Sequence, residues 1–189
     1  NGHIERFLSF RNNDLPGVML AASFEKYIHR YGVVADTSPV IFTNNSSTFS
    51  LLKTMVDMNH KPKAYVDVRD SKKIEKETLE LINNYNIPFY PKSEIEGCEG
   101  KNQIEIIFIR TKKDKTLKIK TSMLCISGGL NPDIHLFTQS KGLVKWDEKI
   151  LTFKPEKSFQ NTITLGSVSG NFHFEKLVEE VNKKLGLSL

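Results

Sequence analysis

Three turns rich in small and polar residues are the parts of this sequence best suited to hold a phosphate or another anion. They are "TNNSSTF" (43–49), "SGGLNP" (127–132) and "GSVSG" (166–170). Each follows an apolar run that predicts a buried strand and precedes a segment with helical spacing. Helix N-termini attract anions, and small residues let a ligand approach the backbone. We therefore take these turns as candidate nucleotide contacts.

The first turn lacks the glycines of a dinucleotide-binding fingerprint. In G-x-G-x-x-G the glycines permit a tight turn and close approach of the pyrophosphate. Asn44 and Asn45 tolerate left-handed backbone angles, and Ser46 or Ser47 can cap the next helix. These side chains would crowd a pyrophosphate, although a lone anion could still bind at the helix N-terminus. The turn is therefore either a weak anion site or a strand–helix turn that only shares the fold.

The two later turns allow two interpretations. Gly128 and Gly129 end a predicted buried strand, and Gly166 and Gly170 bracket the third turn. Small residues at the carboxyl end of a strand are where α/β sheets receive phosphates. Tight packing without a ligand also requires such residues, so both interpretations stay open. Asp67 ends the second predicted strand near the place of a ribose-binding acid, which is weak support without the glycines.

The elements that would position these turns predict an α/β fold with parallel strands, because strands and helices alternate. The helix at 11–32 has Asp14 as a candidate N-cap and Gly32 as a candidate C-cap. The predicted strands lie at 40–43, 63–68 and 87–90, and the helices at 11–32, 47–59 and 72–86.

After residue 90 the pattern changes to an antiparallel meander followed by mixed elements. The meander strands are "NQIEIIFIR", "TLKIKT" and "SMLCISG". A short helix is predicted in "IHLFTQSKG" and two short strands in "VKWDEKILTFKP". A strand, "TITL" (162–165), then leads into the third turn and a helix that starts near residue 171.

Composition excludes several classes of function. The net charge is +5, and much of the excess lies in 110–120, where lysines without interleaved aromatic residues predict a solvated face and not a nucleic-acid site. No apolar run reaches the roughly 20 residues that span a bilayer. The two cysteines suggest a reducing, cytoplasmic location, and the five histidines lack the spacing of metal ligands.

Several stretches resemble the α subunit of heterotetrameric sarcosine oxidase. They are "GHIERFLSFRNNDLPGVMLA", "VIFTNNSSTF" and "ISGGLNPDIHLFTQSKGLVKWDE". They are also similar to relatives among opine oxidase and hydrogen cyanide synthase subunits. "ISGGLNP" looks like the turn that returns the chain to a cofactor domain, and "LGSVSG" like the turn that closes it, in flavoproteins with two dinucleotide-binding domains.

The resemblance implies an oxidoreductase that acts on secondary amino acids such as sarcosine. It implies NAD in the α subunit, with FAD or FMN elsewhere in the complex and the amine-oxidising flavin site on a partner subunit. Ser167 stands where flavin enzymes of this architecture carry an aspartate for the ribityl chain, which favours NAD over FAD. The expected cofactor contacts are Asn44, Asn45, Ser46, Gly128, Gly129, Gly166, Ser167, Val168 and Gly170.

The resemblance also implies a domain organisation. Residues 33–121 are expected to form an inserted Rossmann-like domain, and 1–32 with 122–189 part of a companion dinucleotide-binding domain. The family's amino-terminal glycine-rich unit is missing, so the chain is expected to be the middle of a longer subunit. Alone, this piece is expected to be inactive and to self-associate through exposed sheet edges. The alternative is a noncatalytic scaffold that keeps the fold for subunit assembly.

Overall fold

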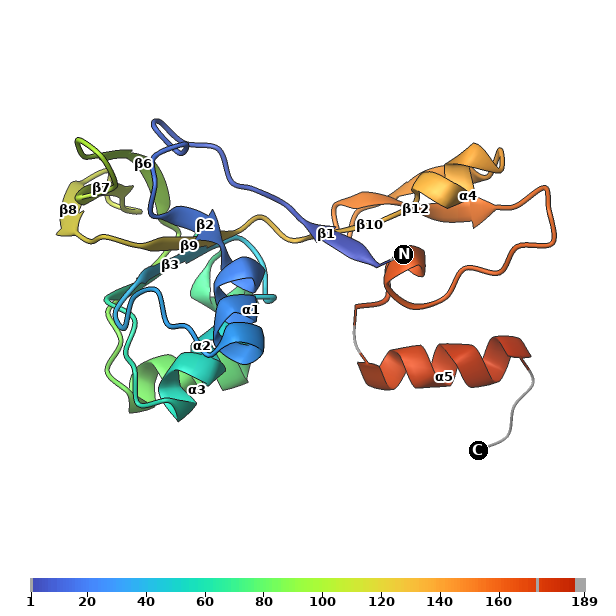
Figure 1. Cartoon of the computed structure of the whole chain (residues 1–189), viewed down its shortest axis with the longest axis horizontal. Coiled ribbons are helices and arrows are strands. Elements are labelled where there is room, and N and C mark those ends of the chain that lie inside the picture. Colours follow the sequence, from blue (N-terminus) through green and yellow to red (C-terminus); the bar gives the residue numbers. More distant parts are fainter. Residues whose placement is uncertain (1, 173, 186–189) are drawn as a thin grey trace. The chain divides into compact units, whose positions relative to one another are not determined.

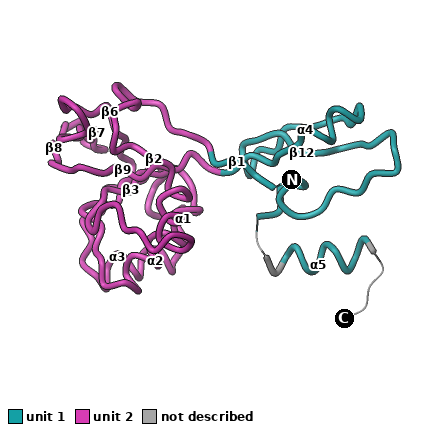
Figure 2. Tube along the Cα trace, viewed as in Figure 1, with its two compact units in different colours: residues 1–5, 130–189 teal, residues 6–129 magenta. Residues whose placement is uncertain are grey.

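The structure, a computed structural model, describes residues 2–172 and 174–185. The chain forms two compact units, which Figure 2 distinguishes by colour. The larger unit comprises Arg6–Gly129, and the smaller unit comprises Asn1–Glu5 and Leu130–Leu189.

A five-stranded parallel sheet forms the centre of the larger unit. Its strands, in spatial order, are β2 (Val18–Leu20), β9 (Leu124–Ser127), β3 (Val40–Thr43), β4 (Ala64–Asp67) and β5 (Phe89–Pro91). Every residue of β3, β4 and β9 is buried, as expected for parallel strands covered on both faces. The predicted α/β fold with a parallel sheet is confirmed.

Three helices cover one face of this sheet: α1 (Ala21–Tyr31), α2 (Phe49–Asp57) and α3 (Lys76–Asn84) (Figure 1). A short 3-10 turn, Ser71–Lys73, precedes α3. Their buried side chains pack against Ile41 and Tyr65, which point to this side of the strands. No helix in the described part of the chain is both long and apolar enough to cross a membrane.

A three-stranded antiparallel meander covers the opposite face, so the larger unit has three layers (Figure 1). Its strands are β6 (Glu94–Glu99), β7 (Ile106–Arg110) and β8 (Thr116–Lys120). Ile107 and Ile109 are fully buried and belong to the same cluster as Phe42 and Val66 of the parallel strands. Successive side chains of β3 therefore pack in two different hydrophobic cores. Ile41 lies in the core on the helical side of the sheet, and Phe42 lies in the core on the meander side.

The predicted helix at 11–32 is wrong in its first half. Helix α1 begins only at Ala21, so Asp14 is not its N-cap, whereas Gly32 ends it in the predicted left-handed conformation. Val18–Leu20 instead form a strand paired with β9. Gly17 has a φ of +99°, and a Cβ there would lie 2.4 Å from the Ser122 carbonyl oxygen, so the chain turns tightly just before this strand.

The predicted meander contains one wrong strand. "SMLCISG" contributes β9, which is parallel and lies between β2 and β3. The third meander strand is β6, which sequence analysis missed because its alternation is broken by a bulge between Ile95 and Gly97. The other predicted strands and helices of this unit are present: β3 has the predicted bounds, β5 ends one residue later than predicted, and the rest are shorter.

The described residues of the smaller unit form two antiparallel strand pairs, two helices and a 3-10 turn. Its elements are β1 (His3–Glu5), β10 (Leu130–Pro132), α4 (His135–Gln139), β11 (Leu143–Asp147), β12 (Thr152–Lys157), η2 (Gly166–Ser169) and α5 (Phe174–Leu185). Strand β1 pairs with β10, and β11 pairs with β12. The predicted short helix, hairpin and final helix are confirmed. The strand predicted at 162–165 is absent, and there the Thr164 carbonyl accepts a hydrogen bond from the Lys184 ammonium.

The compact units divide the chain at positions other than the expected domain boundaries. Residues 6–32 and 122–129 lie in the larger unit, because β2 and β9 are strands of its sheet. The assignment of 1–32 and 122–189 to a companion cofactor domain concerns a longer subunit and stays a prediction.

Candidate functional site

The carboxyl ends of β3, β4 and β9 bring three polar residues to one edge of the parallel sheet. These residues are Thr43, Asp67 and Ser127, and none is exposed to solvent. Strand β4 lies on one side of β3 and β9 on the other, so this edge contains the point where the strand order reverses. Open α/β sheets bind ligands at that point. We call this edge the sheet mouth.

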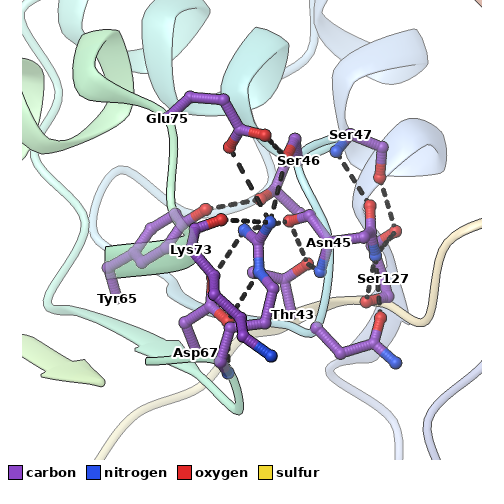
Figure 3. Close-up of polar contacts among 12 residues, drawn as sticks. Thr43, Asn45, Ser46, Ser47, Tyr65, Asp67, Lys73, Glu75 and Ser127 are labelled. Carbon is purple, nitrogen blue, oxygen red and sulfur yellow. Dashed lines mark hydrogen bonds and ion pairs between the residues drawn. The ribbon is translucent and has the colours of Figure 1, made fainter. Parts of the chain in front are cut away.

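Side chains of the first turn span the sheet mouth (Figure 3). The Asn45 amide nitrogen donates to the Ser127 carbonyl oxygen at 3.0 Å, and the Ser47 and Ser127 hydroxyls lie 2.7 Å apart. These contacts join the loop after β3 to the end of β9. They hold the turn against the end of β9.

Side-chain hydrogen bonds set the shape of this turn, and its asparagines do not have a left-handed backbone conformation. The Asn45 N–H donates to the Thr43 hydroxyl at 3.1 Å, and the Ser47 N–H donates to Asn45 Oδ1 at 2.8 Å. Asn44 and Asn45 are not among the residues with positive φ, which corrects the prediction. Neither serine caps α2, because the N-cap is Thr48, whose hydroxyl instead lies 2.7 Å from the Tyr65 hydroxyl.

Arg69 closes the other side of the sheet mouth. Its side chain donates to both carboxylate oxygens of Asp67, from Nε at 3.1 Å and from Nη2 at 2.9 Å. The same guanidinium donates to the Asn45 carbonyl and to the Ser46 hydroxyl, each at 3.0 Å. Ser46 also donates to Glu75, which lies 3.8 Å from Arg69. Figure 3 shows these partners around one centre.

Electrostatic interactions favour the pairing of Asp67 with Arg69. Burial raises the pKa of the Asp67 carboxyl, and its hydrogen bonds from Arg69 oppose that rise. Burial lowers the pKa of Arg69, but its contacts with Asp67 outweigh this effect and raise it overall. Burial likewise raises the pKa of the Tyr65 hydroxyl. Because the Asp67 side chain is also fully buried, it would have to become exposed before it could bind a ribose hydroxyl.

Gly128 and Gly129 permit the close passage of another chain segment. The Gly128 N–H donates to the Arg6 carbonyl, and the Arg6 N–H donates to the Gly129 carbonyl, both at 2.8 Å. A Cβ at Gly128 would lie 3.0 Å from the Phe7 carbonyl oxygen. One at Gly129, where φ is +99°, would lie 2.5 Å from Arg6 Nη2. The close packing of Arg6 and Phe7 thus explains why both positions are glycine. Contact of these glycines with a nucleotide stays a prediction.

The turn at 166–170 is organised by a carboxylate from α5. The Gly166 N–H donates to Glu180 Oε2 at 3.1 Å, and the Ser169 hydroxyl donates to Glu180 Oε1 at 2.9 Å. Burial raises the pKa of Glu180, but these hydrogen bonds outweigh it and lower the pKa overall. Sequence analysis missed Glu180, because nothing in the helix marks it apart from its neighbour Glu179.

The remaining residues of this turn are packed within the smaller unit. Ser167 Oγ lies 3.2 Å from Nδ1 of His3, and Val168 is half-buried. Gly166 and Gly170 both have positive φ, and a Cβ on either would meet a side chain at 2.8 Å. The expected contacts therefore fall into two groups: those at 44–46 and 128–129 lie in the larger unit, and those at 166–170 in the smaller one.

Comparison with known proteins relates the chain to one kind of subunit. No protein-family model matches it. It is 27% identical over 173 residues to sarcosine oxidase subunit alpha of Corynebacterium sp. (strain U-96) and 28% identical over 176 residues to that of Rhizobium meliloti (strain 1021). The resemblance to sarcosine oxidase subunit alpha is confirmed. The matches cover 88% and 89% of the chain but only 18% and 16% of those relatives.

Solved structures support the fold. Thioredoxin reductase of T. acidophilum superposes with a TM-score of 0.69 at 15% identity, covering 96% of this chain and 59% of the reductase. L-proline dehydrogenase from P. horikoshii gives a TM-score of 0.54 at 18% identity, covering 99% of this chain and 34% of that enzyme. The chain therefore has a fold similar to that of these two proteins.

Proposed function

We propose that the chain is part of the α subunit of a sarcosine oxidase-like oxidoreductase that oxidises a secondary amino acid, with the flavin site on a partner subunit. The observation that carries this proposal is the similarity to sarcosine oxidase subunit alpha over about nine-tenths of the chain. The parallel sheet of the larger unit is consistent with it, since such sheets bind dinucleotides.

The proposed nucleotide is NAD, and the proposed contacts lie mainly at the turn of residues 166–170. Ser167 has a neutral hydroxyl where an acid would hold a ribityl chain, which supports a nicotinamide over a flavin dinucleotide. Gly128 and Gly129 are included as contacts because they end a strand at the sheet mouth. Asn44, Asn45 and Ser46 would reach a ligand only if the hydrogen bonds of Arg69 opened.

A second candidate function is supported by the closed sheet mouth. Three contacts occupy it: Asn45 with Ser127, Ser47 with Ser127, and Arg69 with Asp67. If these contacts keep the sheet mouth closed, the larger unit would serve as a noncatalytic scaffold for the assembly of subunits.

Calorimetric titration of the purified chain tests the NAD proposal. We expect weak saturable binding of NAD with a small rise in melting temperature, because a ligand bound only by the folded state stabilises it. FAD serves as the matched control and should bind more weakly, and the purified chain should lack flavin absorbance. Absence of NAD binding would favour the scaffold, and tighter binding of FAD would refute the choice of nucleotide.

A further inference from the structure

Strand β8 forms an open edge of the meander in the larger unit. The strand order of this sheet is β6-β7-β8, so in the described part of the chain β8 pairs with β7 alone (Figure 1). An open edge presents backbone groups with which a further strand can pair. We propose that the β8 edge binds an extended acidic segment of a partner protein, which adds to the sheet as a further strand. The proposal does not depend on which of the two candidate functions is correct.

The hydrogen bonds of the β7–β8 hairpin determine which backbone groups face the open edge. The Thr111 N–H donates to the Lys115 carbonyl at 3.0 Å. Residues of an antiparallel pair alternate between bonded and non-bonded positions, so Leu117 and Ile119 bond to β7. The N–H and C=O groups that point away from β7 are therefore those of Thr116, Lys118 and Lys120.

The same edge carries positive charge that the fold does not neutralise. Five exposed lysines lie on β8 and in the turn before it: Lys112, Lys113, Lys115, Lys118 and Lys120. None of them forms an ion pair with another described residue. Within 110–120 the one acidic residue is Asp114. Lys63 adds another ammonium group at this edge, where its Nζ donates to the Lys120 carbonyl at 2.9 Å.

The acidic residues of the neighbouring strand β6 are already paired with arginines. Glu94 pairs with Arg110, which also lies 3.9 Å from Glu96. Glu99 lies 3.4 Å from Arg11. These carboxylates therefore do not offset the charge of the lysines on β8. A partner with negative charge would be attracted to this edge.

The two faces of β8 indicate the side-chain pattern of the segment that would bind. Lys118 lies on the outer face, with Nζ 5.3 Å from the centroid of the Phe108 ring, and Lys120 shares this face. Leu117 lies on the opposite face and is 36% exposed. A further strand would place acidic side chains beside the lysines and an apolar side chain beside Leu117. The expected segment therefore alternates acidic and apolar residues.

The lysines also discriminate among the strands that could pair here. Lysines on an edge strand disfavour pairing with strands of like charge. A second copy of β8 would bring its own lysines against this edge, so pairing between two β8 edges is disfavoured. An acidic strand reverses the sign of this interaction. The edge should therefore be selective for acidic segments.

Amide chemical shifts of the whole chain test the proposal with short capped peptides. The first peptide alternates glutamate and valine, and the second has lysine in place of glutamate. The third is the glutamate peptide with a methyl group on every backbone nitrogen, which keeps the charge but removes the strand's hydrogen-bond donors. We expect the first peptide alone to shift the amides of Thr116 and Lys118 saturably, with weaker binding at higher salt. No saturable shift with this peptide, or equal affinity of the methylated one, would overturn the proposal.

Two further titrations distinguish other occupants of the edge. A double-stranded oligonucleotide tests nucleic acid, and dilution of the chain alone tests a second copy. We expect the oligonucleotide to bind more weakly than the glutamate peptide, and the amide signals of Thr116 and Lys118 to be independent of protein concentration. Tighter binding of the oligonucleotide at these amides, or shifts of the same signals on dilution, would assign the edge to another occupant and refute the proposal.

Charge-reversal variants test the role of the lysines. Lys118→Glu combined with Lys120→Glu should raise the dissociation constant of the glutamate peptide about fivefold or more, because two exposed ion pairs are lost. Lys26→Glu combined with Lys53→Glu is the matched control, since it changes the net charge equally at exposed positions of α1 and α2 and should have little effect. Unfolding curves show whether each variant remains folded, and Lys118→Gln replaces the first variant if it does not. Unchanged affinity in the folded edge variant would contradict the proposal.

Discussion

Arg69 donates three hydrogen bonds to the carboxylate of Asp67, from its backbone N–H at 2.8 Å, from Nε at 3.1 Å and from Nη2 at 2.9 Å. The side chain of Asp67 is fully buried and that of Arg69 is 18% exposed. Because the same guanidinium reaches Asn45 and Ser46, one ion pair ties the end of β4 to the turn after β3. This pair is one of the three contacts at the sheet mouth, beside those of Asn45 and Ser47 with Ser127.

Removing one partner of the ion pair should destabilise the larger unit strongly. Arg69→Met leaves a buried carboxylate without its counter-ion, so we expect a loss of about 3 kcal/mol in the free energy of unfolding by urea. The double variant Asp67→Asn with Arg69→Met should recover part of this loss, because the stranded charge is gone. If the single variant were as stable as the parent, the ion pair of Arg69 would not stabilise the closed sheet mouth.

Gly129 should be required for packing even when no ligand is present. Gly129→Ala introduces a Cβ at a φ of +99°, and we expect this backbone strain, with the displacement of the Arg6 guanidinium, to cost about 2 kcal/mol in unfolding free energy. Gly32→Ala is the matched control, because it also has positive φ but has no atom within 4 Å of the added Cβ. Equal losses at the two positions would mean that contact with Arg6 contributes nothing.

Glu180 should make the stability of the chain depend on pH in mildly acidic solution. Its folded-state pKa is lowered, so its stabilising effect is present above the unfolded pKa and is lost as pH falls through the folded pKa. Glu180→Gln should therefore reduce the loss of stability below about pH 4.5. Glu179→Gln, a change of the exposed neighbour, should not. Identical pH profiles for the parent and Glu180→Gln would contradict this role.

The sequence was sufficient to predict the main layers of the larger unit. The apolar runs around Ile41 and Val66, with helices between them, indicated parallel strands covered on both faces. Local patterns could not distinguish strand from helix at Val18–Leu20, because three apolar residues fit either period. They also could not place β9, whose position beside β3 depends on long-range pairing.

The candidate site was only partly visible in the sequence. The absence of glycine between Val40 and Met55 correctly raised the question of a closed turn. Arg69 was missed because it follows a strand, where a charged residue is ordinary, and only the fold brings it to Asn45 and Ser46. The glycines at 128–129 and 166–170 could be identified in the sequence as candidate contacts. Their packing against Arg6 and Leu177 could not be predicted, because these partners lie elsewhere in the sequence.

Amide chemical shifts recorded during a titration with NAD would test the closed sheet mouth most directly. We expect the N–H signals of Asn45, Ser46 and Ser47 to stay unchanged in the parent chain, with any saturable shifts confined to Gly128, Gly129 and the residues near 166–170. Saturable shifts at Asn45–Ser47 in the folded parent chain would contradict the closure and would place a nucleotide at the mouth.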